Sequence, residues 1–387
     1  ISCSLVGSEM CIRDRNWYLK QMAKEKNINL RLATFCKPDE IGKIDLDLYG
    51  INYNMYVRPR GGIVNELKRG LAWISKLEIC NKYAGLTTID YRIGMRRMLR
   101  ELEDENYEPD IIIMQWTEIL FFLPILKKIW ANAKFVAIEE DVSYLGMQRK
   151  RDFYKNVFQK AFFACKARRV KKLEIRYLNQ CNLVVFNNEK DYKLSCGDGY
   201  VGKSIIWSVF YQNLSDRKLC NNGSNEVVFY GAMAREENWK SCVWFIKNVL
   251  PEIEDKEIKF VVIGSGPKAK LLSYASDRVI IKGFVEDVGK ELAQSMCLVA
   301  PLVMGAGIKV KILEAMSLGL PVLTNDIGIE GIPMIDQVDY YHCEKPQDYI
   351  DTINRICKKR EDASYIGCNA KPVSYTHLRA HETAANL

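Results

Sequence analysis

A chain of 387 residues is too long for one ordinary hydrophobic core, so two domains are expected. The composition, 48% hydrophobic and 27% charged, is that of a globular protein. The 13 cysteines form neither a C-x-x-C pair nor a metal-ligand pattern, which excludes a disulfide framework and a zinc finger. This pattern fits reduced thiols in the cytoplasm. The net charge of +8 comes largely from residues 149–176, which hold eleven basic and two acidic residues.

Neither end of the chain fits the rest of the sequence. Residues 1–15 and 372–387 look like translated adaptor sequence, and we leave them out of the fold prediction as one leaves out tags. The first predicted helix then covers residues 16–25, whereas an α/β domain of this kind should open with a strand and a glycine-rich turn. We therefore expect the chain to be truncated at its amino end, to lack the first strand of its amino-terminal domain and to be a poor enzyme for that reason.

Residues 16–212 are predicted to form an amino-terminal α/β domain. Its predicted strands and helices alternate, which indicates a doubly wound parallel sheet. The strands are predicted at residues 28–35, 111–114, 134–138 and 182–187, and helices at residues 62–75 and 88–104. The longest apolar run, residues 111–126, is interrupted by Gln115 and Pro124, so a buried strand followed by a helix is favoured over a membrane span.

The basic segment, residues 149–176, is predicted to be one long helix. Aromatic and apolar residues are interleaved with the basic ones and are expected to face the core: Phe153, Tyr154, Phe158, Phe162, Phe163, Leu173 and Tyr177. Two interpretations of the basic face stay open, an ordinary solvated surface and a surface for anionic lipid headgroups. Nucleic acid is not expected as a partner.

The second half of the chain repeats the α/β pattern more clearly. A stretch rich in Asn and Ser, residues 213–225, is predicted to be a linker. A second α/β domain is predicted for residues 226–345, followed by helices in residues 346–371. Its strands are predicted at residues 227–230, 260–263, 279–282, 297–300 and 322–324, and its helices at residues 239–249 and 308–318.

The stretch from residue 300 to residue 331 carries the most informative pattern. A strand ends, the turn Gly305–Gly307 follows, and a helix begins at Ile308, whose side chain is expected to face the sheet. Two glycines let the backbone approach a ligand closely, and the free N–H groups of the new helix attract an anion. Because ligands bind beyond the carboxyl ends of strands in such sheets, we expect a diphosphate to bind at this turn.

Three side chains of this helix are candidates for contacts with a nucleotide. Lys309 and Lys311 are expected to leave the sheet-facing side near the start of the helix, where they could bind phosphate. Glu314, one turn after Lys311, could accept hydrogen bonds from ribose hydroxyls. Gly319 and Pro321 supply the signals that end this helix.

Four runs of the second domain resemble one enzyme family in order and spacing. They are GAMAREENWKSCVWFIKNVLPEI, FVVIGSGP, GFVEDV and APLVMGAGIKVKILEAMSLGLPVLTNDIGIEG. Over roughly residues 226–335 the chain resembles the carboxyl-terminal domain of family-four retaining glycosyltransferases, the glycosyl transferases group 1. The resemblance implies the α/β fold called GT-B, in which two Rossmann-like domains with parallel sheets face a cleft.

The resemblance also assigns a donor site for a nucleoside-diphosphate sugar. It places Glu314 at the ribose, Lys309 and Lys311 at the diphosphate, where they would stabilise the leaving group, and Val285 beside the base. The donor site that it implies comprises Gly231, Val285, Gly305, Ala306, Gly307, Ile308, Lys309, Lys311, Glu314 and Glu330. One departure is at Ala306, where the family has the first Glu of an E-x7-E motif, so the sugar contact usually given to that Glu is in doubt.

The amino-terminal half matches the family more loosely. Residues 140–142 with Arg149 resemble its His-Asp-Val…Arg segment, with Glu in place of His, which makes Asp141 a candidate catalytic residue on the acceptor side. The other interpretation of the acidic residues 139–141 is an ordinary solvated strand end. His342 is expected to be a surface or filler residue.

The function that we predict is transfer of a sugar from a nucleoside-diphosphate sugar to a glycan or lipid-linked acceptor, with retention, in cell-surface polysaccharide synthesis. The resemblance implies that no metal or other cofactor is needed, and the lack of a D-x-D or His/Asp metal pattern in the donor half agrees. The protein is expected in the cytoplasm, with a peripheral place at the inner face of the membrane. Two alternatives stay open, a sugar-nucleotide epimerase of the same fold and a non-catalytic GT-B subunit of a glycan-assembly complex.

Overall fold

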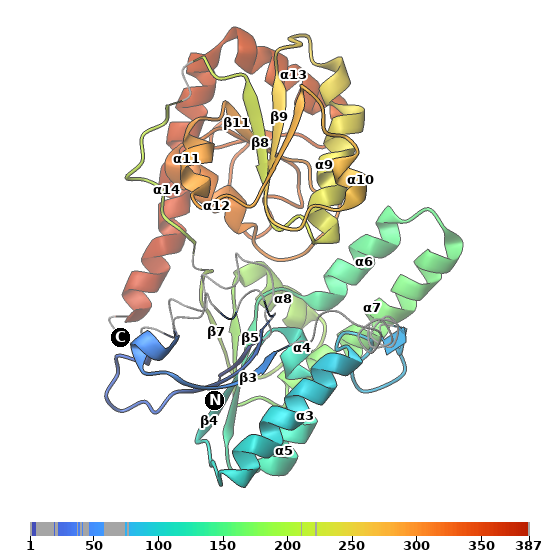
Figure 1. Ribbon diagram of the computed structural model, residues 1–387, viewed down its shortest axis with the longest axis vertical. Helices are drawn as coiled ribbons and strands as arrows, with labels where there is room; N and C mark the ends of the chain where they lie inside the picture. The colour runs from blue at the N-terminus through green and yellow to red at the C-terminus, as the bar shows by residue number, and fades with distance from the viewer. Residues whose placement is uncertain are drawn as a thin grey trace. The chain divides into compact units, whose positions relative to one another are not determined.

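The structure of the chain is a computed structural model, which describes residues 2–4, 19, 22–36, 38, 41, 46–57, 74–75, 77–209, 211–220 and 223–385. The chain divides into two compact units, an amino-terminal unit that runs to Trp207 and a carboxyl-terminal unit that begins at Ser208. Each unit is an α/β structure built on a parallel sheet (Figure 1). Within the described ranges, no helix combines the length and the apolar character needed to cross a bilayer.

The sheet of the amino-terminal unit has the strand order β3-β2-β1-β4-β5-β6-β7, and every pairing is parallel. The strands are β1 (Ser2–Ser4), β2 (Arg31–Cys36), β3 (Asn52–Val57), β4 (Ile111–Gln115), β5 (Lys134–Glu139), β6 (Leu183–Phe186) and β7 (Ser204–Ile206). The order reverses direction between β1 and β4, as in doubly wound sheets. Central strands such as β4 are apolar because helices cover both faces of the sheet.

Helices connect these strands and bury their apolar faces on the sheet. They are the 3-10 helix η2 (Leu46–Tyr49), α3 (Ile89–Asp104), α4 (Thr117–Leu120), α5 (Leu123–Ile129), α6 (Ser143–Phe153), α7 (Val157–Leu178) and α8 (Glu189–Gly197). The predicted single basic helix is therefore two helices, α6 and α7, which pack side by side as a hairpin (Figure 1). The break occurs at Asn156, whose side chain caps α7 by accepting hydrogen bonds from the N–H groups of Phe158 and Gln159.

The sheet of the carboxyl-terminal unit has the order β10-β9-β8-β11-β12-β13, again with parallel pairings. The strands are β8 (Glu226–Tyr230), β9 (Lys259–Ile263), β10 (Val279–Gly283), β11 (Cys297–Ala300), β12 (Val322–Thr324) and β13 (Tyr341–His342). Here the order reverses between β8 and β11. In doubly wound sheets, ligands bind beyond the carboxyl ends of the strands at this point.

The helices of this unit are α9 (Glu236–Asn248), the 3-10 helix η3 (Leu250–Glu252), α10 (Ala269–Leu272), α11 (Val288–Ala293), α12 (Val310–Leu318), α13 (Pro346–Lys358) and α14 (Arg360–Ala385). Every residue of α12 is buried, because the helix contacts β11 and β12 and is also covered by α14. Gly319 ends α12 in the left-handed conformation, with φ of 82°, as its place after the apolar pattern predicted.

Three features differ from the expectations for the chain's ends and middle. Residues 1–15 were expected to contribute no element, but Ser2–Ser4 pair with β2 and β4, since a ladder needs only the backbone groups of an extended segment. The segment 213–225, expected as a linker, packs in part on the carboxyl-terminal unit, with Leu214 buried in its core. Helix α14 continues past residue 372, the predicted start of a foreign tail, and the carbonyl of Ser374 accepts a hydrogen bond of 2.5 Å from the Tyr211 hydroxyl.

The remaining predicted elements agree with the structure in kind, with ends shifted by a few residues. The elements that were expected are strands β2, β4, β5, β6, β8, β9, β10, β11 and β12 and helices α3, α9, α12, α13 and the first part of α14. Of the predicted helices at residues 16–25 and 62–75, the structure describes only residues 19, 22–25 and 74–75, so most of the second lies outside the described residues. Helix α12 begins at Val310 instead of Ile308, because the glycine turn extends to Lys309.

Candidate functional site

A glycine turn precedes α12 at the reversal point of the carboxyl-terminal sheet. Gly305 and Gly307 have φ values of 118° and 71°, which residues with a Cβ atom rarely adopt. Residues 301–309, which include both glycines, connect the end of β11 to the start of α12, where the first N–H groups have no partner within the helix. Ile308, at the end of the turn, packs against the core as expected. The predicted glycine turn is therefore present, and the binding of an anion there stays a prediction.

Lys309 joins the glycine turn to the loop after β12. Its Nζ atom donates hydrogen bonds to the carbonyls of Ala306, at 3.1 Å, and Gly307, and lies 3.6 Å from the Oε2 atom of Glu330. Glu330 is buried, so the ion pair is poorly screened by water. The structure thus brings together Ala306, Gly307, Lys309 and Glu330, all of which the sequence predicted as donor-site residues.

Lys311 differs from its prediction because it is buried, with only 4% of its surface exposed. Its Nζ atom donates a hydrogen bond of 2.8 Å to Oδ1 of Asn238 and lies 4.1 Å from the centre of the Phe229 ring. Burial lowers the pKa of Lys311 to about 7. The expected open face of α12 does not exist, because every residue of the helix is buried. The long alkyl chain of Lys311 is suited to such an apolar environment.

Gly231 and Gly264 make room for this buried ammonium group. A Cβ atom on Gly231, at the end of β8, would lie 2.9 Å from Nζ of Lys311, and a Cβ atom on Gly264 would lie 1.7 Å from the carbonyl oxygen of Gly231. The loops after β8 and β9 can therefore approach each other only because residue 264 is glycine, and Gly231 leaves the space that the Lys311 and Asn238 side chains occupy. The predicted residues Gly231 and Lys311 are direct neighbours.

Glu314 lies deeper in the unit than a ribose-binding residue was expected to lie. Its carboxylate accepts hydrogen bonds from the hydroxyl of Tyr230 and from the backbone N–H of Gln212, the latter at 3.2 Å. The residue is 3% exposed. Its assignment to ribose stays a prediction, as does that of Val285, which follows β10 and packs partly buried against the core.

Asn238 and Tyr230 belong to this site and were missed from the sequence. Asn238 accepts from Lys311 and donates through Nδ2 to the carbonyl of Ala232 at 3.0 Å, so it holds the loop after β8. A signal was present: Asn238 is four and seven residues before Cys242 and Phe245, on the buried side of α9. A polar residue on the apolar side of a helix indicates a buried hydrogen-bond partner.

The acidic strand end of the amino-terminal unit is not an ordinary solvated surface. Glu139 and Glu174 are both buried, and the Thr117 hydroxyl lies 3.0 Å and 3.2 Å from their Oε1 atoms. Burial and the nearby Glu174 carboxylate raise the pKa of Glu139 well above its usual range. The N–H of Ser143 donates to Glu174 at 2.9 Å, which fixes the segment that holds the half-buried Asp141.

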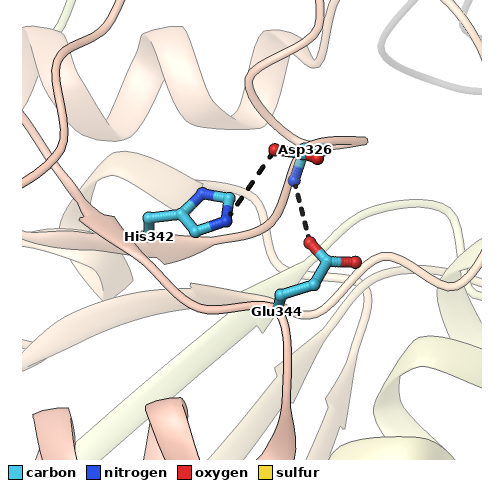
Figure 2. Close-up of side chains that lie close together, drawn as sticks. All are labelled: Asp326, His342 and Glu344. Atoms are coloured by element: carbon cyan, nitrogen blue, oxygen red, sulfur yellow. Dashed lines mark hydrogen bonds and ion pairs between the residues drawn. The ribbon is translucent and has the colours of Figure 1, made fainter.

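Three possible metal ligands meet at the carboxyl ends of β12 and β13, where Figure 2 shows Asp326, His342 and Glu344 side by side. One ligand atom from each lies within 4.8 Å of the others, and the Asp326 N–H donates to Glu344 Oε2 at 3.3 Å. The Nδ1 atom of His342 is hydrogen-bonded to Tyr340 at 3.1 Å, which turns Nε2 toward Asp326.

Two carboxylates and an imidazole are a ligand set that could hold a divalent cation, although all three residues are exposed to solvent at least in part. The sequence shows no His/Asp metal pattern in this half of the chain, because the three residues come together only in the folded unit. Adjacent parallel strands bring together residues that are far apart in the sequence. His342, expected to be a surface or filler residue, is partly exposed and lies beside these two carboxylates.

Residues 224–359 match the sequence model of the family described as glycosyl transferases group 1. No protein with a curated function matches the chain by sequence.

Solved structures match the chain over nearly its whole length. HepE from Anabaena, in complex with UDP and glucose, is 13% identical with a TM-score of 0.68, and the match covers 100% of this chain and 98% of HepE. Sucrose-phosphate synthase from Thermosynechococcus elongatus is 12% identical with a TM-score of 0.68, over 100% of this chain and 98% of the synthase. A mutant of TarM from S. aureus, in complex with fondaparinux, alpha-GlcNAc-glycerol and UDP, is 14% identical with a TM-score of 0.66, over 99% of each chain.

These matches confirm the predicted GT-B fold, and the family match lies on the unit that contains the glycine turn. Residues 224–359 therefore form a domain of the glycosyl transferases group 1 family, carried in a chain that has the GT-B fold and is a transferase.

Proposed function

We propose that this transferase moves a sugar from a nucleoside-diphosphate sugar, bound at the glycine turn before α12, to a glycan or lipid-linked acceptor. The observation that carries the proposal is the group of cations and N–H donors at the reversal point of the sheet: Lys309 and Lys311 lie on either side of the start of α12. HepE, which shares the fold, binds UDP and glucose, and this supports a uridine nucleotide as the first donor to test.

In the proposed reaction the bond between sugar and diphosphate breaks, and negative charge grows on the departing diphosphate. Lys309, Lys311 and the N–H groups of α12 would stabilise that charge without having to reorganise, because backbone and side-chain contacts already hold them. Glu314 would accept hydrogen bonds from the ribose, and Val285 would lie beside the base. Gly231 would give the diphosphate close access to the end of β8.

The finer parts of the proposal rest on the family resemblance. Transfer with retention, a role in cell-surface polysaccharide synthesis and Asp141 as the acceptor-side catalytic residue are proposed on that ground. A place in the cytoplasm at the inner face of the membrane is proposed from the basic segment 149–176. Analysis of the product formed from a radiolabelled donor would distinguish transfer from epimerisation.

Lys309→Ala will weaken binding of the cognate nucleoside diphosphate by about tenfold or more, because one charge-assisted hydrogen bond contributes about 1.5–3 kcal/mol. Isothermal titration calorimetry with UDP, GDP and ADP identifies the cognate base and then measures the loss. Lys259→Ala is a matched control, since Lys259 is an exposed lysine at the amino end of β9, away from the glycine turn. Unchanged affinity in both Lys309→Ala and Lys311→Ala would show that the donor site does not lie at this helix.

We expect sugar transfer to continue at the same rate in EDTA, because the two lysines and the start of α12 supply the positive charge that a metal would otherwise supply. The measurement is the initial rate with and without the chelator. If EDTA abolishes transfer and Mg²⁺ or Mn²⁺ restores it, the proposal of a metal-independent enzyme fails. Asp326→Asn and His342→Gln would then show whether the cluster in Figure 2 holds that ion.

A further inference from the structure

The hairpin of α6 and α7 ends in an exposed apolar tip, which no core of the described residues includes. Val157 and Phe158, in the first turn of α7, are 75% and 86% exposed, and Phe153, at the end of α6, is 37% exposed. Exposed Phe158 and Phe153 contradict the expectation that the aromatic residues of this segment all face the core. That expectation holds only for the base of the hairpin, where Leu173 and Tyr177 are buried.

The tip is held in a fixed shape by its own contacts. Asn156 caps α7 with hydrogen bonds of 2.9 Å and 3.2 Å from the N–H groups of Phe158 and Gln159. Beneath the tip, the rings of Tyr154 and Phe163 stack with their centres 5.4 Å apart, and Phe162 packs edge-on against Phe163 at 5.2 Å. Because the turn is already ordered, it loses little conformational entropy when its exposed apolar side chains become buried on binding.

Positive charge surrounds this apolar tip. Between residues 149 and 163 the chain has five basic residues and one acidic residue. Lys155 and Lys160 are exposed next to Val157 and Phe158. Not every base of the wider segment is available: Lys166 is buried with its Nζ atom bound to the Gly85 carbonyl, and Lys171 forms an ion pair with Asp198. Lys155 and Lys160 therefore supply exposed positive charge at the tip itself, and Arg168, Lys172 and Arg176 are exposed farther along α7.

We propose that the α6–α7 tip, residues 153–160, inserts its apolar side chains into the interface of an anionic bilayer while Lys155 and Lys160 bind the lipid headgroups. Apolar groups at the apex and lysines beside them match the order of acyl chains and phosphates in a leaflet. A nucleic acid would match the lysines but would not favour an exposed valine. The inference adds to the proposed function the means by which the enzyme reaches a membrane, and it does not depend on the donor site.

The test is flotation of the full chain with vesicles of phosphatidylcholine, with and without phosphatidylglycerol. The unaltered protein should float with the anionic vesicles and lose binding as salt is raised, because exposed charges are screened. Lys155→Glu/Lys160→Glu changes the charge of the tip by four units, and each unit near an anionic surface changes the affinity about fivefold. The double variant should therefore bind vesicles about a hundredfold or more weakly at low salt. Lys128→Glu/Lys134→Glu, at two exposed lysines far from the tip in the sequence, is the charge-matched control.

Val157→Ser/Phe158→Ser separates insertion from simple adsorption, since it leaves the charge unchanged. We expect it to lower vesicle binding by about tenfold or more. Leu48→Ser/Val201→Ser is the matched control, because these side chains are 83% and 87% exposed in the same unit. Both tip variants should keep the circular dichroism spectrum and the nucleotide affinity of the parent protein.

Failure of the parent protein to bind anionic vesicles at low salt overturns the inference, as does an equal loss in the control variants. A tip variant that turns a dimer into a monomer without changing vesicle binding would make the tip an interface between copies of the chain. Loss of nucleotide affinity in Lys309→Ala with intact vesicle binding would support the donor site and leave the tip untouched, so the two proposals fail separately.

Discussion

Glu314→Ala will destabilise the carboxyl-terminal unit and weaken its nucleotide binding together. The carboxylate is the acceptor for the Tyr230 hydroxyl and for the backbone N–H of Gln212, inside a unit where the residue is 3% exposed. A buried donor left without its acceptor costs about 1–3 kcal/mol, so the free energy of unfolding should fall by about 2–5 kcal/mol. Urea unfolding followed by tryptophan fluorescence measures the loss, and calorimetry should show affinity reduced by about tenfold or more.

Two further variants separate the structural role of Glu314 from its proposed contact with ribose. Glu314→Gln keeps an acceptor for the two internal donors, so it should unfold near the parent protein, yet it lacks the charge and should still bind nucleotide more weakly. In the Glu314→Ala background, Tyr230→Phe should restore part of the stability, because it removes the donor left without a partner. A Glu314→Ala protein that unfolds and binds like the parent would contradict both roles.

The strands of the carboxyl-terminal unit could be predicted because their sequence signals are local. Strands such as β8, β9 and β11 are short apolar runs rich in Val and Ile that end at Gly or Pro. The glycine turn before α12 was visible for the same reason, since only glycines adopt its φ values readily. The two-residue strand β13 carries no such pattern and was missed.

The hairpin of α6 and α7 shows where a local signal was too weak. Residues 143–178 contain no proline, and their one glycine, Gly146, lies inside α6, so a continuous helix was the natural prediction. The turn depends on Asn156, whose capping side chain competes with helix continuation. Asn156, a residue type that favours helix caps, is therefore the feature of the sequence that could have predicted the turn.

Contacts between distant residues were out of reach of the sequence. The carboxyl pair of Glu139 and Glu174 joins a strand end to a helix on a different part of the chain, and the bond from Lys311 to Asn238 joins α12 to α9. Charged residues are rarely buried unless paired, so the sequence alone favoured exposed positions for Lys311 and Glu139. The structure brings several of the predicted donor-site residues together, and the burial of Lys311 and Glu314 changes what their substitution should do.

Binding of a nucleotide sugar will weaken as the pH rises above 7. Burial lowers the pKa of Lys311 to about 7 in the free protein, so the charged form becomes scarce at higher pH. A diphosphate beside Nζ favours that charged form, and the affinity should therefore fall by up to about tenfold per pH unit until the pH passes the pKa of the complex. Calorimetry from pH 6 to pH 9 measures the affinity, and titrations in buffers of different ionisation enthalpy measure the uptake of a proton on binding. The ligand is an intact nucleotide sugar, because its diphosphate does not titrate in this range.

The stability of the free protein should change in the opposite direction over the same range. In the unfolded chain a lysine keeps its proton up to a pKa of about 10.4, whereas Lys311 in the folded unit loses it near 7. Between these values the unfolded state binds more protons, so the free energy of unfolding rises with pH, by at most about 1.4 kcal/mol per unit. Lys311→Met should remove both trends and weaken nucleotide binding at pH 6, while Lys259→Met at an exposed site should keep both. If the affinity of the parent protein is constant from pH 6 to pH 9 while its stability rises, Lys311 is a buried structural lysine that does not touch the diphosphate.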